Sequence, residues 1–308
     1  MNRTTASLNA GARHSDKLST RFGMQFVRTT IDGAGAQGAS DVNILGFTQF
    51  VRTVDFNEFK PWIDPLTGDQ INQINSQNNN PFWIRNENKF LRDDERFIGN
   101  AQLEYEPVEN LTFNGIVGLD IDTDEIFRSN RSGTIGVGTG DFRNNVIQRR
   151  QLDVNARVNY QGEINEDIGF TIRTGFQYLT NTFERDENFG DQLAVVNLFS
   201  PGNAETNFPN NDFNRRDLYG IYGEAEFTYQ TWLTLNVTGR NDWSSTLPLE
   251  NNSFFYPSVS TSFIFSDAFN IASDFFSYGK IRASWAQVGG DTNPYIANFR
   301  FFPVANVF

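Results

Sequence analysis

The residues of this chain that come nearest to a chemical site are carboxylates. Clustered carboxylates can bind a cation or work as an acid and base pair. The largest cluster is Asp120-x-Asp122-x-Asp124-Glu125. It is not an EF-hand loop, because the sixth position holds Glu125 where glycine is required and the twelfth holds Arg131 where glutamate is required. We interpret it as a group of acidic residues at the end of a strand, with incidental cation binding as the alternative.

Two further segments resemble chemical sites, but each lacks a feature that such a site requires. Asp93-Asp94-Glu95 offers neighbouring carboxylates, but adjacent side chains of an extended chain point apart, so we expect a solvated loop. Gly133–Gly140 is glycine-rich like a phosphate-binding loop, yet no Lys-Ser/Thr pair follows it. We expect a flexible loop tip there.

The composition excludes several classes of function. The chain has no cysteine and one histidine, His14, which rules out thiolate catalysis and histidine clusters for a metal. We expect His14 in a turn, no catalytic residue, no cofactor and no enzyme. The formal net charge of −12, from 37 acidic and 25 basic residues, would repel a nucleic acid.

The elements that position these residues are predicted to be strands. No apolar run approaches the roughly 20 residues of a transmembrane helix. Apolar and polar residues instead alternate with period 2 in about ten segments, whose lengths match the 9–11 residues with which a tilted strand crosses a bilayer. The segments pair as hairpins: 6–12 with 20–28, 97–105 with 111–121, 152–160 with 168–178, 219–229 with 233–239, and 255–265 with 276–286.

Two regularities favour a transmembrane barrel over a soluble β-sandwich. Strands end on an aromatic residue of the apolar register just before a short turn, as the interfacial girdle of a barrel requires: Tyr105, Tyr160, Tyr229 and Phe265. Connections alternate between short ones (13–18, 106–110, 161–167 and 230–231) and long ones (30–95, 122–148, 180–216 and 240–254). Short periplasmic turns and long extracellular loops are typical of outer-membrane barrels, and the polar registers then line the lumen.

Ten strands are expected to be part of a larger barrel. The polar registers contain many small residues, such as Gly118 and Gly175, which supply too little bulk to fill the lumen of a small barrel. Met1–Thr5 lacks the apolar core of a signal peptide, so we expect a truncated chain.

Several motifs resemble one family. GRNDWSSTLPLENNSFFYPSVSTSFIFSD (239–267) and SYGKIRASWAQVGGDTNPY (277–295) resemble barrel segments of SusC/RagA-type TonB-linked outer-membrane transporters of Bacteroidetes-like bacteria. RTVDF (52–56), NPFWIRNEN (80–88) and DDERFIGN (93–100) resemble segments that occur in the same order in that family. One departure is Gly290, where the family pattern has asparagine.

The resemblance implies an architecture and partners. It implies that residues 1–308 are part of one all-β, antiparallel transmembrane barrel of about 22 strands, with the plug, signal peptide and C-terminal strands outside this chain. It also implies the outer membrane of a Gram-negative cell, energy from the TonB complex through the N-terminal region, and a SusD-like lipoprotein as lid. The cargo would be a glycan or a peptide.

Two sets of residues are candidates for contacts. Long loops carry Trp62, Phe82, Trp83 and Arg85, which could stack on a sugar, grip a peptide or contact the lid; packing within the loop is the alternative. The strongest motif is centred on Arg240, Asn241, Asp242 and Trp243. There the register predicts Arg240 and Asp242 toward the lumen, as an ion pair or a plug contact, and Trp243 toward lipid in the girdle.

The sequence therefore favours active import through a barrel wall. A small passive porin or purely structural barrel is the alternative, and a secreted carbohydrate hydrolase is a weaker one because no carboxylate pair has suitable placement. The sequence does not identify the cargo.

Overall fold

The computed structural model describes residues 1–33, 55–72, 79–271 and 276–296. Residues 52–54 of the RTVDF segment lie outside the described residues. The helices are the short η2 (Phe56–Phe59), α1 (Pro81–Glu87), η3 (Pro201–Asn203), η4 (Leu249–Asn251) and α2 (Phe265–Ala268). The strands are β1 (Asn2–Ser15), β2 (Leu18–Asp32), β3 (Lys89–Val108), β4 (Leu111–Arg131), β5 (Gly140–Asn165), β6 (Ile168–Leu193), β7 (Ala204–Tyr229), β8 (Leu233–Ser244), β9 (Ser253–Ile264) and β10 (Lys280–Ala286).

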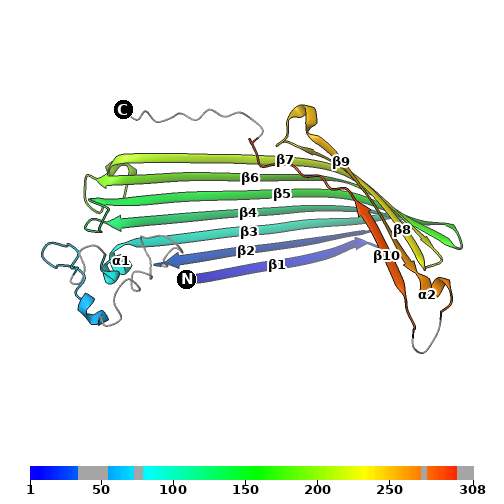
Figure 1. The fold of residues 1–308 in the computed structure, drawn as a ribbon, viewed down its shortest axis with the longest axis horizontal. Helices are drawn as coiled ribbons and strands as arrows, with labels where there is room; N and C mark the ends of the chain where they lie inside the picture. The colour runs from blue at the N-terminus through cyan, green and yellow to red at the C-terminus, as the bar shows by residue number, and fades with distance from the viewer. Residues whose placement is uncertain (34–54, 73–78, 272–275, 297–308) are drawn as a thin grey trace.

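The ten described strands form a single antiparallel sheet in chain order, from β1 at one edge to β10 at the other. Every neighbour in space is therefore also a neighbour in sequence, as in an up-and-down barrel wall. In Figure 1, β1–β7 lie side by side along the long axis, while β8–β10 cross them steeply, so the sheet is strongly twisted and curled. The short turns lie at one end together with α2, and α1 lies at the other end with the β4–β5 and β6–β7 connections.

The longest strands extend far beyond the predicted segments. The expected loops 122–148 and 180–216 are mostly strand, because the true connections are only 132–139 and 194–203. The expectation of a loop at Asp93-Asp94-Glu95 is likewise wrong, since these residues belong to β3, and His14 lies in β1 and not in a turn. The backbone ladder continues in these regions although the alternation of apolar and polar side chains has ceased.

The two faces of the sheet differ along every strand. Even-numbered residues of β3, β4 and β7–β10 share one face with odd-numbered residues of β1, β2, β5 and β6, as the pairing register requires. We call this polar face the lumenal face. The opposite, outward face exposes large apolar side chains, among them Phe22 at 54%, Ile221 at 53% and Ile281 at 60%.

Few apolar side chains are buried within the protein. Among the described residues they are Phe59, Trp83, Ile84, Phe90, Phe142 and Leu193. The apolar residues of the outward face are accordingly the surface of a barrel that lipid covers. No helix in the described segments of the chain is long and apolar enough to cross a membrane.

Aromatic rings mark the turn end of the outward face. Tyr105 contacts Phe113 with ring centroids 6.4 Å apart, and Tyr160 contacts Phe170 at 5.9 Å. Trp232 continues the row, with its ring 5.1 Å from that of Tyr229 and 5.5 Å from that of Phe263. The place predicted for Phe265 belongs to Phe263, because β9 ends at Ile264 and Phe265 begins α2.

A second aromatic row marks the other limit of the apolar surface. Tyr178, Tyr219 and Trp243 are cross-strand neighbours on β6, β7 and β8, and the rings of the two tyrosines stack at 4.8 Å. The next outward-facing residues of β7 are the ion-paired Asp217 and Arg215. The ten residue-to-residue steps from Tyr219 to Tyr229 span about 33 Å of strand, or about 25 Å of height at a tilt of about 40°, which is the height of an outer-membrane apolar band.

We call this upper limit the boundary line. It passes through the outward-facing residues Phe26, Phe97, Ile121, Leu152, Tyr178, Tyr219 and Trp243. Beyond it, toward the long connections, the outward face turns polar at Arg28, Glu95, Thr123, Arg150, Thr180 and Asp217.

Candidate functional site

The lumenal face carries a row of ion pairs at the boundary line and just beyond it. Arg96 binds Asp120 through both carboxylate oxygens, with N–O distances of 2.9 and 2.5 Å. Arg149 donates to Asp122 at 2.9 Å. The pairs lie side by side because the β3–β4 and β4–β5 registers place these side chains on one face of neighbouring strands. Such two-pronged contacts fix the orientation of a guanidinium.

A third pair continues this row toward the loops. Arg92 donates to both oxygens of Asp124, at 2.7 and 2.8 Å, and to Asp94 at 3.3 Å. Burial and the nearby carboxylates of Asp122 and Asp124 raise the pKa of Asp94, while Arg92 and Arg96 only partly oppose this. The first sequence cluster is thus engaged by arginines. No group of three or more metal-ligating side chains occurs among the described residues, so nothing there supports the cation-binding alternative.

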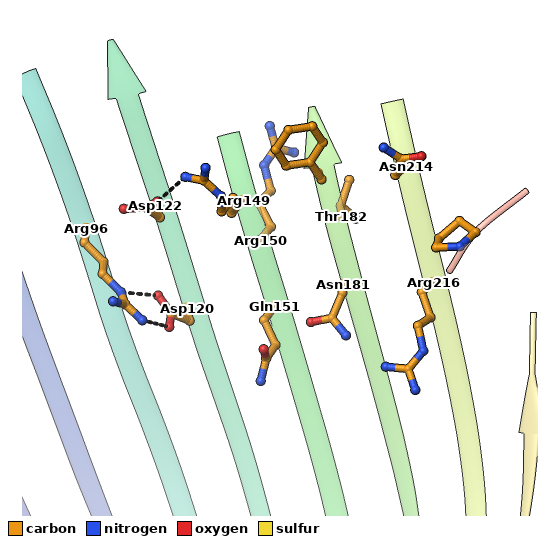
Figure 2. Close-up of a pocket in the computed structure, with 12 residues that line it drawn as sticks. Arg96, Asp120, Asp122, Arg149, Arg150, Gln151, Asn181, Thr182, Asn214 and Arg216 are labelled. Carbon is orange, nitrogen blue, oxygen red and sulfur yellow. Dashed lines mark hydrogen bonds and ion pairs between the residues drawn. The ribbon is translucent and has the colours of Figure 1, made fainter. Parts of the chain in front are cut away.

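A depression of about 450 Å³ opens beside these pairs on the lumenal face. Figure 2 shows its side chains on adjacent strands: Arg96, Asp120, Asp122, Arg149, Gln151, Asn181, Asn214 and Arg216. Phe183 also lines it, and the Arg149 guanidinium lies 5.7 Å from the centre of the Phe183 ring. We call this depression the lumenal pocket. Its alternating guanidinium, carboxylate and amide groups offer hydrogen bonds to a polar ligand.

Two glycines allow large side chains to lie flat on the lumenal face. Tyr222 crosses Gly175 to donate to Asn155 Oδ1 at 3.1 Å, and a Cβ at Gly175 would come within 2.5 Å of the Tyr222 ring. Arg240 crosses Gly220 in the same way and donates to Gln177 Oε1 at 2.9 Å. A Cβ at Gly220 would come within 2.5 Å of the Arg240 guanidinium. Because Tyr222 and Arg240 lie flat over these glycines, their side chains project less into the lumen, which leaves the lumen wider.

The predicted rim residues lie where the register places them. Arg240 and Asp242 share the lumenal face, with Arg240 Nε 2.7 Å from Asp242 Oδ1, and Tyr256 also donates to Asp242. Trp243 is half-buried on the outward face at the boundary line, opposite Tyr219. Asn241 exchanges hydrogen bonds with Ser253 on β9. This arrangement ties the ends of β8 and β9 together.

The predicted loop residues have unlike surroundings. Trp83 is completely buried, and its Nε1 donates to Thr134 Oγ1 at 2.9 Å, which ties α1 to the β4–β5 turn. Trp62 is half-buried, stacks on Phe82 at 6.0 Å and donates to Glu87 Oε1 at 3.0 Å. Arg85 is exposed. Trp83 therefore packs within the protein, while Arg85 and portions of Trp62 and Phe82 remain accessible.

The loop around α1 is ordered by one asparagine. Asn80 is fully buried; its side chain caps α1 by accepting from Phe82 N at 2.9 Å and donates to the backbone oxygens of Phe59 and Ile71. The segment Asn78-Asn79-Asn80 reads as turn-rich polar chain in sequence, so this role is hidden there.

Sequence reasoning also missed the arginines of the lumenal pocket. Arg96, Arg149 and Arg216 lie among residues expected in or beside loops, where no register was drawn. The register that pairs Tyr105 with Phe113 places Arg96 opposite Asp122 and diagonal to Asp120, provided that the ladder continues. The sequence did not indicate that the β3–β4 ladder continues beyond the predicted segments, so this pairing was not predicted.

Known structures share this architecture. A structure of the RagAB peptide transporter matches with a TM-score of 0.72 and 15% identity over 92% of this chain and 32% of that chain. Structures of the RagAB peptide importer in the 'open-open' and 'closed-closed' states match with a TM-score of 0.70 each, at 16% and 15% identity and the same coverage. This chain therefore spans about a third of the length of the chains it matches. At these identities the likeness shows the fold alone.

The comparison at sequence level gives a family. Among curated protein sequences, none matches this chain significantly. The family model described as "TonB dependent receptor-like, beta-barrel" matches residues 7–303, which is nearly the whole chain. Together with the lipid-facing and lumenal faces of the sheet, this match shows that the chain belongs to the TonB-dependent receptor-like β-barrel family.

Proposed function

We propose that this chain forms a section of the wall, rim and extracellular loops of an outer-membrane importer of oligosaccharides or peptides. The observation that carries the proposal is the lumenal pocket, which lies on the face opposite to the lipid and is lined mostly by side chains that carry hydrogen-bonding groups. A ligand on its way through the lumen would meet this surface directly. The family supports the proposal, since its proteins are outer-membrane receptors and transporters and not enzymes.

We further propose that residues 1–308 belong to one barrel domain that works with a plug. Energy would come from the TonB complex through the N-terminal region of the full-length protein, and a SusD-like lipoprotein would cover the extracellular loops. The matched structures are described as those of a peptide transporter and peptide importer, called RagAB, solved in open and closed states. They support peptides as one of the two cargo classes. Arg85, with the accessible portions of Trp62 and Phe82, is our candidate for contact with lid or cargo.

The test is uptake by cells that carry the full-length gene or a deletion of it. Labelled oligopeptides and labelled oligosaccharides are supplied separately, with and without a functional TonB complex. We expect TonB-dependent uptake of one class. A protein found in the soluble fraction would contradict the proposal, and uptake that persists without TonB would favour the passive porin.

A pair of variants on β5 tests whether the lumenal pocket takes part. Arg149→Gln removes a charged hydrogen-bond donor from the pocket, so we expect the half-saturating cargo concentration to rise about tenfold. Arg143→Gln changes the same residue type on the same face of the same strand, but Arg143 pairs with Glu187, outside the pocket. Equal effects of both substitutions would argue against a role for the pocket.

A further inference from the structure

The segment after β10 leaves the sheet edge and crosses the lumenal face. Gln287 N donates to Pro257 O at 3.0 Å, which continues the ladder by one residue. Gly289 then passes so close to the Phe254 ring that a Cβ there would lie 2.7 Å from Cδ2. Asp291 reaches β7, and Pro294 lines the lumenal pocket. Figure 1 shows this path as the thin red trace that runs from β10 toward β7. We call residues 287–296 the strap.

Asp291, near the middle of the strap, makes several hydrogen bonds to β7, to the end of β8 and to a residue after β8. Arg216 Nε and Nη2 donate to the two carboxylate oxygens of Asp291 at 2.6 and 2.9 Å. Ser244 Oγ donates to the same carboxylate at 2.5 Å and Thr246 Oγ1 at 3.3 Å. Ser244 and Thr246 are buried, with 1% and 6% of their surface exposed. Arg216, Ser244 and Thr246 thus form a cradle whose planar fork and hydroxyls match a carboxylate.

The ionisation of Asp291 is consistent with a strong contact. Burial alone would raise the pKa of Asp291, but the hydrogen bonds from Arg216, Ser244 and Thr246 and the charge of Arg216 outweigh it, so the pKa lies below its ordinary value. The carboxylate is therefore charged at neutral pH.

Arg216 differs from Arg96 and Arg149 in the source of its counter-ion. Arg96 and Arg149 pair with Asp120 and Asp122, which are fixed in β4 and belong to the wall itself. The partner of Arg216 lies 75 residues further along the chain, outside the strands. Removal of the strap would therefore leave Arg216 without its counter-ion, while the ion pairs of Arg96 and Arg149 remained intact.

Exchange at the cradle is energetically reasonable. A tethered group competes with an effective concentration in the millimolar range for short flexible linkers. Gly289 and Gly290, which directly precede Asp291, reduce the steric cost of moving the strap. A carboxylate-bearing ligand concentrated in the lumen can reach the same range and replace Asp291.

We propose that Arg216, Ser244 and Thr246 form a carboxylate-binding site that the chain's own Asp291 occupies at rest and a carboxylate of the cargo occupies after displacing the strap. This inference rests on the proposed function in that the cargo passes along the lumenal face. It adds a chemical requirement, a free carboxylate, and it gives the strap the role of an internal competitor.

The experiment measures how fast phenylglyoxal modifies each arginine in the purified full-length protein, by peptide mass spectrometry. In Asp291→Asn the charged partner of Arg216 is gone, so we expect the modification of Arg216 relative to Arg96 to rise about tenfold over wild type. Glutarate, the probe carboxylate, should reverse most of this rise. Glutaramide, which has the same shape without the charge, should not.

The matched control is Asp212→Asn, which removes another carboxylate of the lumenal face of β7. Asp212 pairs with Arg185 at 2.5 Å and does not touch the strap, so this variant should leave the ratio for Arg216 unchanged. The inference is overturned if the ratio stays unchanged in Asp291→Asn, if Asp212→Asn raises it equally, or if glutarate and glutaramide protect equally.

A second measurement follows the strap itself. Spin labels on Asn100→Cys of β3 and Asn293→Cys of the strap, in a cysteine-free background, report the distance between them. We expect one narrow distribution that broadens in Asp291→Asn and in wild type with glutarate; a distribution unaffected by both would refute displacement. Neither assay depends on transport. If the cells show no TonB-dependent uptake but glutarate still has the expected effect, the proposed function is refuted and the carboxylate-binding site is not.

Discussion

The same strands pass through two different environments, and β7 shows the contrast well. Between Tyr229 and Tyr219, in the lower region of the sheet, its outward-facing side chains are apolar and exposed on the protein, with Ile221 at 53%. Beyond the boundary line, in the upper region, the outward face carries the ion-paired Arg215 and Asp217. At the far end of the upper region Phe142 is enclosed by the protein itself, with 2% exposed. The lower region uses lipid as its apolar partner, whereas the upper region has its own packed interior and water.

The contrast separates two causes of strand structure. The lower region meets lipid on its outward face and water on its lumenal face, so side chains must alternate with period 2. In the upper region the alternation is no longer required, yet the strands persist because the backbone ladder satisfies its own donors and acceptors. Side-chain pattern and strand length are therefore independent properties of this sheet.

The largest expected effect comes from a charge placed in each region. Val237→Arg puts a guanidinium on the outward face near the middle of the apolar band, and we expect it to cost about 2–4 kcal/mol of unfolding free energy. Val195→Arg makes the same change in the β6–β7 connection, where the side chain is 59% exposed, and should cost less than about 0.5 kcal/mol. Urea unfolding of the full-length protein in lipid vesicles measures both. Similar costs would remove the distinction between the two regions.

A glycine pair tests how tightly each region is packed. A Cβ at Gly190, in the upper region, would overlap the ring of the buried Phe142, so we expect Gly190→Ala to cost about 1–3 kcal/mol. Gly223, on the outward face of the lower region, has nothing within 4 Å, and Gly223→Ala should be neutral or slightly stabilising. The same unfolding assay applies. A neutral Gly190→Ala would mean that the upper region is loosely packed.

The loop end is expected to respond locally to the loss of Asn80. Asn80→Ala removes the α1 cap and two buried hydrogen bonds to backbone oxygens, and we expect a loss of about 1–2 kcal/mol. Limited proteolysis of intact cells should then cut near α1 at a higher rate. Asn86→Ala is the control, because Asn86 is exposed and makes one hydrogen bond, to Phe82 O. If both variants are cut equally fast, Asn80 does not hold this loop.

The smallest expected effect concerns Asp94, which is paired with Asp124 across β3 and β4. Because the folded state raises the pKa of Asp94, the fold is favoured by its protonation, and this contribution fades as the pH rises through the raised pKa. Asp94→Asn should therefore stabilise the protein by a few tenths of a kcal/mol at pH 7 and have no such effect at pH values below the ordinary aspartate pKa. Unfolding at the two pH values measures it. A destabilising Asp94→Asn at pH 7 would show that Arg92 depends on Asp94 as well as on Asp124.

Sequence predicted the lower region of the sheet in some detail. The hairpins 97–121, 152–178 and 219–239 lie inside observed strand pairs, in the register that the alternation gives. The girdle residues Tyr105, Tyr160 and Tyr229 have aromatic partners at the turn end. These features follow from lipid on one face and water on the other. This environment requires apolar and polar residues to alternate within each strand, so each strand can be predicted separately.

The upper region could not be predicted in the same way. Its residues were expected in loops because strands with water on both faces need no alternation of apolar and polar side chains, so the sequence carries no period-2 pattern there. The lumenal pocket belongs to this region, so its arginines were missed, although Asp120 and Asp122, the partners of Arg96 and Arg149, were recognised as part of a cluster.

What the sequence determined by itself is the fold class and the lipid-facing register, because both rest on local spacing, and the TonB-dependent receptor-like family, because its motifs resemble that family. Only the tertiary structure decided that Asp291 meets Arg216, that Trp83 is enclosed under Thr134, and that Asp120 and Asp122 serve arginines. The physical reason is that these contacts depend on how far each ladder runs and where the strap returns. Both are set by long-range pairing and not by the period of any one strand.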